Sequence, residues 1–296
     1  MSNQRAGYAA ILLGAFLFGM WATAGKFVLR DVPPLTVAWF VQAVSAVTFA
    51  PFLWRLRLSS REWRLTLISA TFGGLLAPSL YFTGLNLTTP VNAALISNTE
   101  GLFTVVLAFV VLRERLTRGG YVAGAAILGG ALLVTLNLEQ VDADFGSAIL
   151  GSILLVLAAM CWGVDNTVSR IVTMRHDIPS FVCVKLSFGA LFLSALLLGS
   201  GGSPIIASPH LPLLLVLALT GAAAFTYLFY FAMRRIGALR VGAILATSAA
   251  FGVAIAVAFG FPLTPIQALG GAIMAIGVVV MYREPVARSE GLSDDR

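Results

Sequence analysis

Long apolar stretches separated by short polar loops dominate this sequence. None shows the alternation of apolar and polar residues over about ten positions that is typical of outer-membrane strands. A helix of about 20 residues, rising ~1.5 Å per residue, spans a hydrocarbon layer of ~30 Å. We therefore expect an all-α integral membrane protein with ten transmembrane helices, the third of them kinked at Pro78. The predicted ranges are residues 8–28, 35–54, 65–85, 92–112, 121–138, 147–169, 180–198, 211–233, 241–261 and 266–282.

The composition agrees with this pattern. The chain is 59% hydrophobic and 11% charged, with a mean hydropathy of +0.94, and one globular core cannot hide so much apolar surface. The net charge of +6 comes from basic residues in short loops, so we expect no nucleic acid partner. Cys161 and Cys183 lie inside apolar runs, where buried reduced thiols are the ordinary case.

The charged loops predict the orientation of the helices. Of the 19 Lys and Arg residues, 16 fall on one set of alternate loops and two, Lys26 and Arg30, on the other; Lys185 lies inside a segment. The second set also holds the acidic loop at residues 139–144. By the positive-inside rule both termini are cytoplasmic.

The first segment has a second interpretation. Arg5, the apolar run and the small residues Ala22-Thr23-Ala24 resemble a signal peptide with its cleavage site. We favour a retained helix, because this segment has a counterpart later in the chain that its removal would leave unmatched.

That counterpart belongs to an internal repeat. FGMWATAGKFVLRDVPP around Gly19 matches WGVDNTVSRIVTMRHDIPS around Gly163, with Lys26 opposite Arg170. Two later stretches line up in the same way, residues 81–95 with 230–244 and residues 124–130 with 271–277. Each half holds five segments, an odd number, so we expect the second half to lie inverted in the membrane. The expected units are repeats at residues 1–145 and 146–283 and a charged, disordered cytoplasmic tail at residues 284–296.

The fourth segment carries an acidic residue, Glu100, near its middle. A charge at that depth costs a few kcal/mol or more, so Glu100 should face a water-filled cavity or a partner, or be protonated, and should not face lipid. Two interpretations stay open. Glu100 is either a protonated carboxyl hydrogen-bonded to a neighbouring helix or a site for a proton or cation. Asn98 cannot share its face, because a step of two residues turns ~200° around a helix.

These features resemble the EamA-type branch of the drug/metabolite transporter superfamily. The resemblance rests on the five-plus-five repeat, on the glycine and basic residue of segments one and six, and on the fourth segment from Thr99-Glu100 to Leu112-Arg113-Glu114-Arg115-Leu116. It implies gradient-driven transport through a cavity walled by segments one, three, four, six, eight and nine, with five and ten packed together at the periphery.

Two departures from the family pattern stand out. The usual Glu-Pro pair is Glu100-Gly101, and the second half has Ser248-Ala249-Ala250 where the family often repeats the acidic residue. Any chemistry of Glu100 is therefore done once and not in a symmetric pair.

The polar and aromatic residues of the expected walls predict an amphipathic pocket. We interpret Asp165 with Lys185 as a structural ion pair or as solvated helix ends in preference to a substrate site, and Lys26 with Arg30 as solvated anchors. Glu100 is the candidate for proton coupling. The candidate substrate-binding residues are Glu100, Trp21, Thr23, Tyr81, Asn92, Trp162, Asn166, Tyr227, Tyr230 and Ser248.

No sequence motif of an ATPase, hydrolase or zinc protease is present, so we expect neither an enzyme nor a cofactor or metal. The sequence predicts a secondary transporter of the cytoplasmic membrane, in contact with lipids, that exports small amphipathic metabolites. Amino acids come first, aromatic or hydrophobic ones above all, and Glu100 either couples their transport to protons or only tunes the pocket of a facilitator. The alternatives are a transporter of drug or quaternary-amine cations and a non-transporting membrane protein of envelope assembly.

Overall fold

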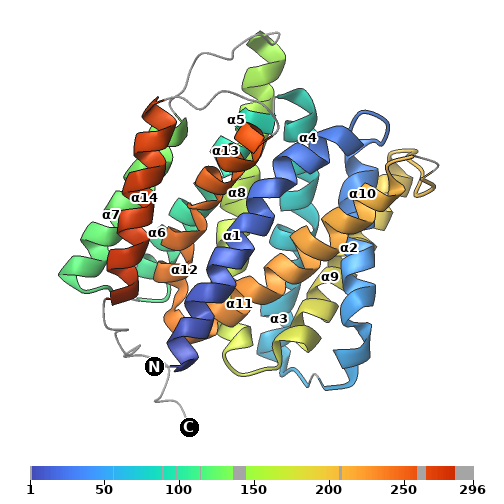
Figure 1. Ribbon diagram of the computed structural model, residues 1–296. Helices are drawn as coiled ribbons and strands as arrows, with labels where there is room; N and C mark the ends of the chain where they lie inside the picture. Colours follow the sequence, from blue (N-terminus) through green and yellow to red (C-terminus); the bar gives the residue numbers. More distant parts are fainter. Residues whose placement is uncertain are drawn as a thin grey trace.

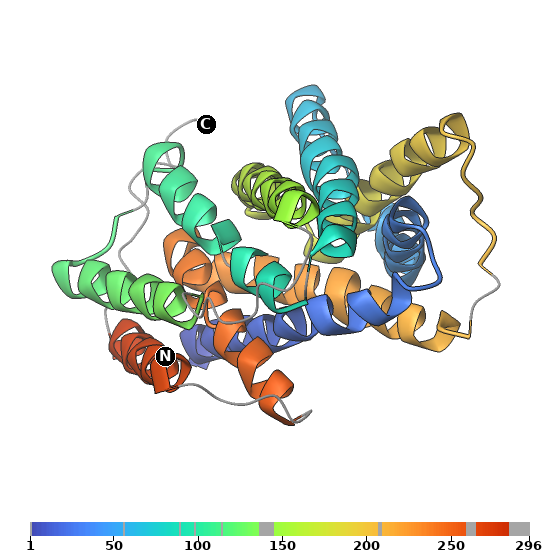
Figure 2. The same ribbon diagram turned by 90° about the horizontal axis from the view of Figure 1, so that it is seen from above.

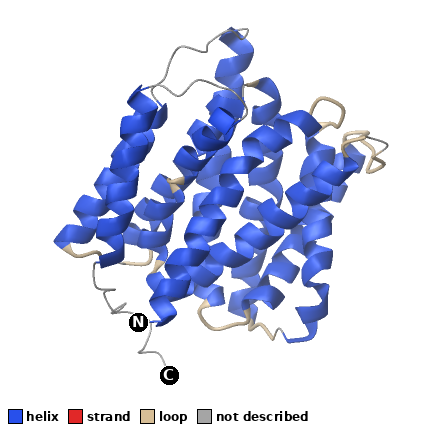
Figure 3. Cartoon of the chain, in the orientation of Figure 1, coloured by secondary structure: helices blue, strands red, loops and turns tan. Residues whose placement is uncertain are grey.

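The computed structural model describes residues 2–55, 57–88, 90–97, 99–113, 115–135, 145–206, 209–258 and 265–283. Throughout these ranges the regular elements are helices (Figure 3). Asn98, the acidic loop at 139–144 and the predicted tail lie outside the described residues.

The described helices group into successive passes of one bundle, numbered one to ten along the chain. Six of the passes are long and apolar enough to cross a membrane. The first five passes are α1 (Ser2–Val28); α2 (Pro34–Phe49), extended by η1 (Ala50–Arg55); α3 (Ser60–Ser69), η2 (Ala70–Leu76) and α4 (Ala77–Leu87); α5 (Pro90–Ser97) and α6 (Thr99–Val110); and α7 (Arg118–Thr135). The second five are α8 (Phe145–Thr173); α9 (Ile178–Gly199); α10 (Leu211–Val216), η3 (Leu217–Ala224) and α11 (Phe225–Ile236); α12 (Ala238–Leu245) and α13 (Ser248–Ala258); and α14 (Pro265–Arg283).

α1 and α8, which begin the two parts of the sequence repeat, start at opposite ends of the bundle. In Figure 1, α1 starts at the lower end of the bundle and α8 starts at the upper end. The start of α1 and the end of α14 lie at the same lower end.

The outer face of the bundle carries large apolar side chains, and three charged residues are buried among its helices. Val47, Val122 and Ile276 are 64–72% exposed, whereas Glu100, Lys185 and Asp165 are at most 3% exposed. This is the distribution of a protein whose solvent is hydrocarbon, where unpaired polar groups are costly. The expectation that Glu100 does not face lipid is confirmed.

The third and eighth passes widen at matching places. Their middle segments, η2 and η3, are π-helical, with one turn wider than an α-helix. In the third pass the predicted irregularity lies on the N-terminal side of Pro78, because the proline ring lacks an N–H and crowds the carbonyl four residues earlier. The widened segment is where the chain absorbs that conflict.

The ninth pass consists of two helices, where the sequence predicted one. A turn separates α12 from α13, and the hydroxyl of Thr247 donates to the Ile244 carbonyl at 2.7 Å. Hydroxyls that bond nearby carbonyls compete with the helical ladder, and so the pass can divide there. In the fourth pass, α5 and α6 lie on either side of Asn98, which is outside the described residues.

Contacts between helices follow the same correspondence. α2 packs on α9 and α7 on α14, each pairing an element with its counterpart in the other half, and α6 of the fourth pass packs on α12 of the ninth. Likewise α1 packs on α11 and α13, while α8 packs on α4 and α6. Figure 2 shows α7 and α14 side by side at one edge, which confirms that segments five and ten pack together at the periphery.

Two basic residues clamp helix ends, which corrects the interpretation of Lys26 as a solvated anchor. The Lys26 ammonium donates to the carbonyls of Leu85, Asn86 and Thr88 at 2.7–2.9 Å, at the C-terminus of α4. Its counterpart in the repeat, Arg170, donates to the Met233 carbonyl near the C-terminus of α11. A cation at a helix C-terminus meets the negative end of the helix dipole.

Two adjacent glycines in α7 offer a test of the α7–α14 packing. A Cβ on Gly130 would approach the Met274 Cγ to 2.6 Å and the Gly270 carbonyl to 2.7 Å, whereas a Cβ on Gly129 would meet nothing within 4 Å. We expect Gly130→Ala to destabilise the protein by about 1–3 kcal/mol through overpacking. Gly129→Ala is the matched control and should be neutral or slightly stabilising. Thermal unfolding in detergent measures both; equal unfolding temperatures would contradict the packing.

Candidate functional site

A cavity lies at the centre of the bundle between the two halves. α1, α2, η2 and α6 of the first half line it, together with α8, α9, η3 and α11 of the second. About 40 Å³ of it is wide enough for the centre of a water molecule. A water needs ~10–15 Å³ of such space, so this conformation has room for a few waters. A larger solute needs the walls to separate.

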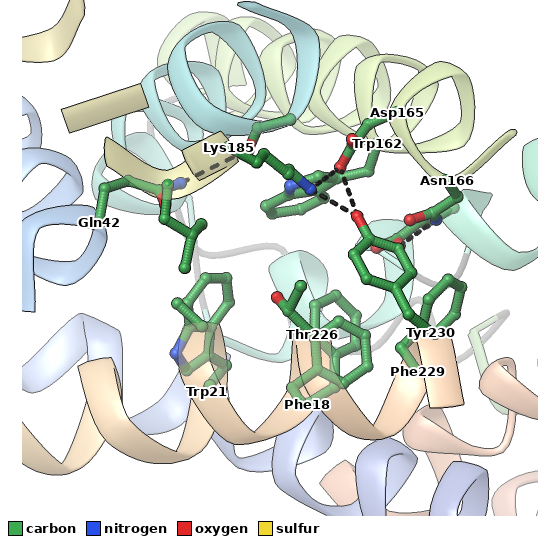
Figure 4. A pocket seen from close by; sticks show the side chains of 16 residues that line it. Phe18, Trp21, Gln42, Trp162, Asp165, Asn166, Lys185, Thr226, Phe229 and Tyr230 are labelled. Carbon is green, nitrogen blue, oxygen red and sulfur yellow. Dashed lines mark hydrogen bonds and ion pairs between the residues drawn. The ribbon is translucent and has the colours of Figure 1, made fainter. Parts of the chain in front are cut away.

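One side of the cavity carries a buried ion pair. The Lys185 ammonium of α9 bonds the Asp165 carboxylate of α8 and donates to the Tyr230 hydroxyl at 2.6 Å. Asp165 also accepts from Ser69 at 2.5 Å and Ser169 at 2.9 Å. Figure 4 shows Lys185 reaching both Asp165 and Tyr230. The ion pair is therefore formed, and the interpretation as solvated helix ends is wrong.

Glu100 lines the same cavity, and among the described residues only one of its two carboxylate oxygens has a hydrogen-bond partner. Asn166 of α8 donates to Glu100 Oε1 at 2.9 Å and also to the Thr104 hydroxyl at 3.1 Å. Glu100 Oε2 is buried and has no hydrogen-bond partner among the described residues. A buried acceptor without a donor is costly, so this oxygen suits a proton or a donor group of a ligand.

Aromatic rings form the facing wall. Trp21 and Phe18 of α1 lie with Trp162 of α8, their ring centroids 6.0–6.1 Å apart (Figure 4). Phe225 stacks on Phe18 at 5.0 Å. Rings at such separations attract one another and offer an apolar and cation-attracting face.

The widened segments make room for two of these side chains. A Cβ on Gly73 of η2 would collide with the Asp165 carboxylate, and a Cβ on Gly221 of η3 would collide with the Trp21 indole. The indole N–H of Trp21 donates to the Leu217 carbonyl of η3 at 3.3 Å. Each π-helical segment thus has a glycine at the point where a side chain of a neighbouring helix enters the cavity.

Five of the ten predicted binding residues line the cavity. They are Trp21, Glu100, Trp162, Asn166 and Tyr230. A sixth, Tyr81, is 1% exposed and packs behind the aromatic wall, with its ring centroid 5.3 Å from those of both Trp21 and Trp162.

The other four predicted residues do not line this cavity. Tyr227 lies on another face of α11, in a separate hollow near Asp177 and Arg234, because one residue beyond Thr226 turns ~100° away. Thr23 is two residues from Trp21 and turns away for the same reason. Ser248 starts α13, where its carbonyl faces Gly19 of α1. The side chain of Asn92 lies outside the described part of the chain.

The cavity walls differ from the prediction in three passes. Gln42 of α2 and Lys185 of α9 line the cavity, although segments two and seven were not expected to do so. The ninth pass was expected to line it but contributes no lining residue among those described. Gln42 bonds the Gly73 carbonyl weakly at 3.5 Å, and its Oε1 is buried without a partner among described residues. A glutamine inside an apolar segment was the available signal. No cluster of metal ligands occurs in the described ranges.

The buried pair should behave as a unit. We expect Lys185→Met alone to destabilise the protein by about 3–5 kcal/mol, because it leaves the Asp165 charge buried and unpaired. The double variant Asp165→Asn, Lys185→Met removes both charges with little change of volume and should regain most of the loss. Thermal unfolding of the single and double variants checks this. Additive losses would show that the two residues do not form a unit.

Comparisons with known proteins agree with the fold and the cavity. An uncharacterized transporter of Methanothermobacter thermautotrophicus is 27% identical, over 93% of this chain and 86% of its own. The uncharacterized transporter YyaM of Bacillus subtilis is 24% identical, over 91% of each chain. A solved crystal structure at 20% identity has the same fold, with a TM-score of 0.72 over 94% of this chain and 96% of its own.

The family comparison covers both halves. Residues 5–136 and 149–283 each match the EamA-like transporter family. The matched residues make up most of the chain and include every helical pass. This multi-pass membrane protein therefore belongs to the EamA-like transporter family.

Proposed function

We propose that this transporter works by alternating access between two inverted repeats, residues 1–145 and 146–283, with both termini in the cytoplasm. The matched helix contacts, the opposite directions of α1 and α8, and the paired irregular segments support the repeat. In such transporters the site lies between the halves, and rocking them exposes it to each side in turn. The narrow cavity would then widen toward one side at a time.

We further propose that the protein exports small amphipathic solutes bearing an ammonium group across the cytoplasmic membrane. Amino acids with aromatic or hydrophobic side chains come first. One observation carries this proposal: the uncommitted Glu100 Oε2 shares a cavity with an aromatic wall. The oxygen suits an ammonium donor, and the rings suit an apolar side chain.

Glu100 also provides a coupling mechanism. A proton and a ligand ammonium compete for the same uncommitted oxygen, so Glu100 binds one or the other and never both at once. Asn166 holds the first oxygen in place throughout. Such competition at one carboxylate is sufficient to exchange protons for solute.

Glu100→Gln tests the coupling in proteoliposomes loaded with labelled phenylalanine. The amide keeps the shape of the side chain but cannot exchange a proton near neutral pH. We expect normal insertion, with flux that no longer responds to an imposed pH gradient, whereas wild-type flux does respond. Glu62→Gln is the matched control, because Glu62 lies outside the cavity and bonds His176 and Ser59. A pH response that survives in Glu100→Gln would identify Glu100 as a structural carboxyl.

A second candidate is a transporter of lipophilic cations, favoured by the charge of the lining. With Glu100 ionised, the lining of two acids and one lysine carries one net negative charge, which a monovalent cation cancels.

The two candidates differ in the charge they move. Exchange of one proton for a monovalent cation is electrically neutral, whereas exchange of one proton for a zwitterion moves one charge. We expect phenylalanine flux to change when a potassium diffusion potential is imposed across the proteoliposome membrane. Flux of a labelled lipophilic cation that ignores the potential, with no phenylalanine flux, would instead select the second candidate.

A further inference from the structure

The Lys185 ammonium has bonding capacity that its protein partners leave unused. It lines the cavity and is 3% exposed. A lysine ammonium carries three N–H donors, and the described residues take two of them, through Asp165 and the Tyr230 hydroxyl. A third donor in a buried site calls for an acceptor.

Asp165 does not depend on Lys185 alone. Its carboxylate accepts from the hydroxyls of Ser69 and Ser169 at 2.5 and 2.9 Å, and lies 3.4 Å from the Tyr230 hydroxyl. These hydroxyls stay in place if Lys185 turns toward a ligand. The aspartate is thus held by short side chains, whereas the lysine reaches it on a long flexible stem.

The cavity therefore offers an uncommitted donor and uncommitted acceptors together. The donor is the third N–H of Lys185, and the acceptors are Glu100 Oε2 and Gln42 Oε1. A simple amine would satisfy Glu100 and leave the lysine donor unpaired. A zwitterion can satisfy both, with its carboxylate on the lysine and its ammonium on the glutamate.

We propose that Lys185 is the subsite for the substrate's carboxylate, so that the protein selects amino acids over the corresponding amines. This proposal rests on the proposed transport function and adds the substrate class to it. The ammonium meets Glu100, and the side chain lies against Phe18, Trp21 and Trp162. In the empty protein, Asp165 and Tyr230 hold the lysine in place.

Two ligands that differ only in the carboxylate test the subsite. Phenylalanine and phenethylamine share the ring and the ammonium, and binding of each to the purified protein in nanodiscs gives an affinity ratio. We expect wild type to bind phenylalanine at least tenfold more tightly than phenethylamine. In the double variant Asp165→Asn, Lys185→Met, phenylalanine should lose at least tenfold in affinity while phenethylamine changes less than threefold.

Lys26→Met is the matched control, since Lys26 is a basic residue that clamps α4 outside the cavity, and its variant should keep the wild-type ratio. The proposal is overturned if the double variant, with an unfolding temperature near that of wild type, keeps the wild-type ratio. Equal affinities for the two ligands in wild type would also overturn it while leaving amine transport standing. If neither ligand binds and neither shows counterflow, the proposed function is overturned as well.

Discussion

A buried ammonium and a buried carboxylate each need a partner, and this requirement organises the centre of the molecule. Asp165 and Lys185 come from adjacent passes, α8 and α9, and meet inside an apolar bundle. Removing a charge from water costs several kcal/mol, which mutual attraction repays only when further hydrogen bonds complete the site. Ser69, Ser169 and Tyr230 supply those bonds from the third, sixth and eighth passes. The pair thus ties both halves of the chain to one point.

That point needs space, and irregular helices provide it. An α-helix with a side chain at position 73 or 221 would exclude Asp165 or Trp21 from the cavity. The π-helical segments depart from regular α-helical geometry, and their glycines let the neighbouring helices approach closely. Such segments are frequent at functional sites. The divided ninth pass adds a further irregularity, because a turn separates α12 from α13. Regular structure is given up where the two halves meet.

The sequence predicted what depends on local pattern. The helical membrane fold, the peripheral α7–α14 pair and the interior position of Glu100 follow from apolar length, small residues and the cost of charge in lipid. Five residues that line the cavity were proposed from their type and depth. What could not be predicted depends on helix rotation and on long side chains: Tyr227 differs from Tyr230 only in the face it occupies, and Lys185 reaches inward from a pass that was not expected to line the cavity. The break near Thr247 accompanies a hydroxyl bond that no apolar pattern records.

The alignment of the halves accounts for the polarity of the cavity. Trp21 and Asp165 occupy matching positions, two residues after Gly19 and Gly163, and Tyr81 matches Tyr230. In the first half, Tyr81 packs among Trp21, Phe82 and Trp162, whereas in the second, Tyr230 bonds Lys185 and Ser169. Corresponding positions thus supply an apolar wall on one side and a charged wall on the other. A symmetric pair of walls would bind a molecule in two orientations equally well, whereas these two walls differ in polarity and so distinguish the two ends of a bound molecule.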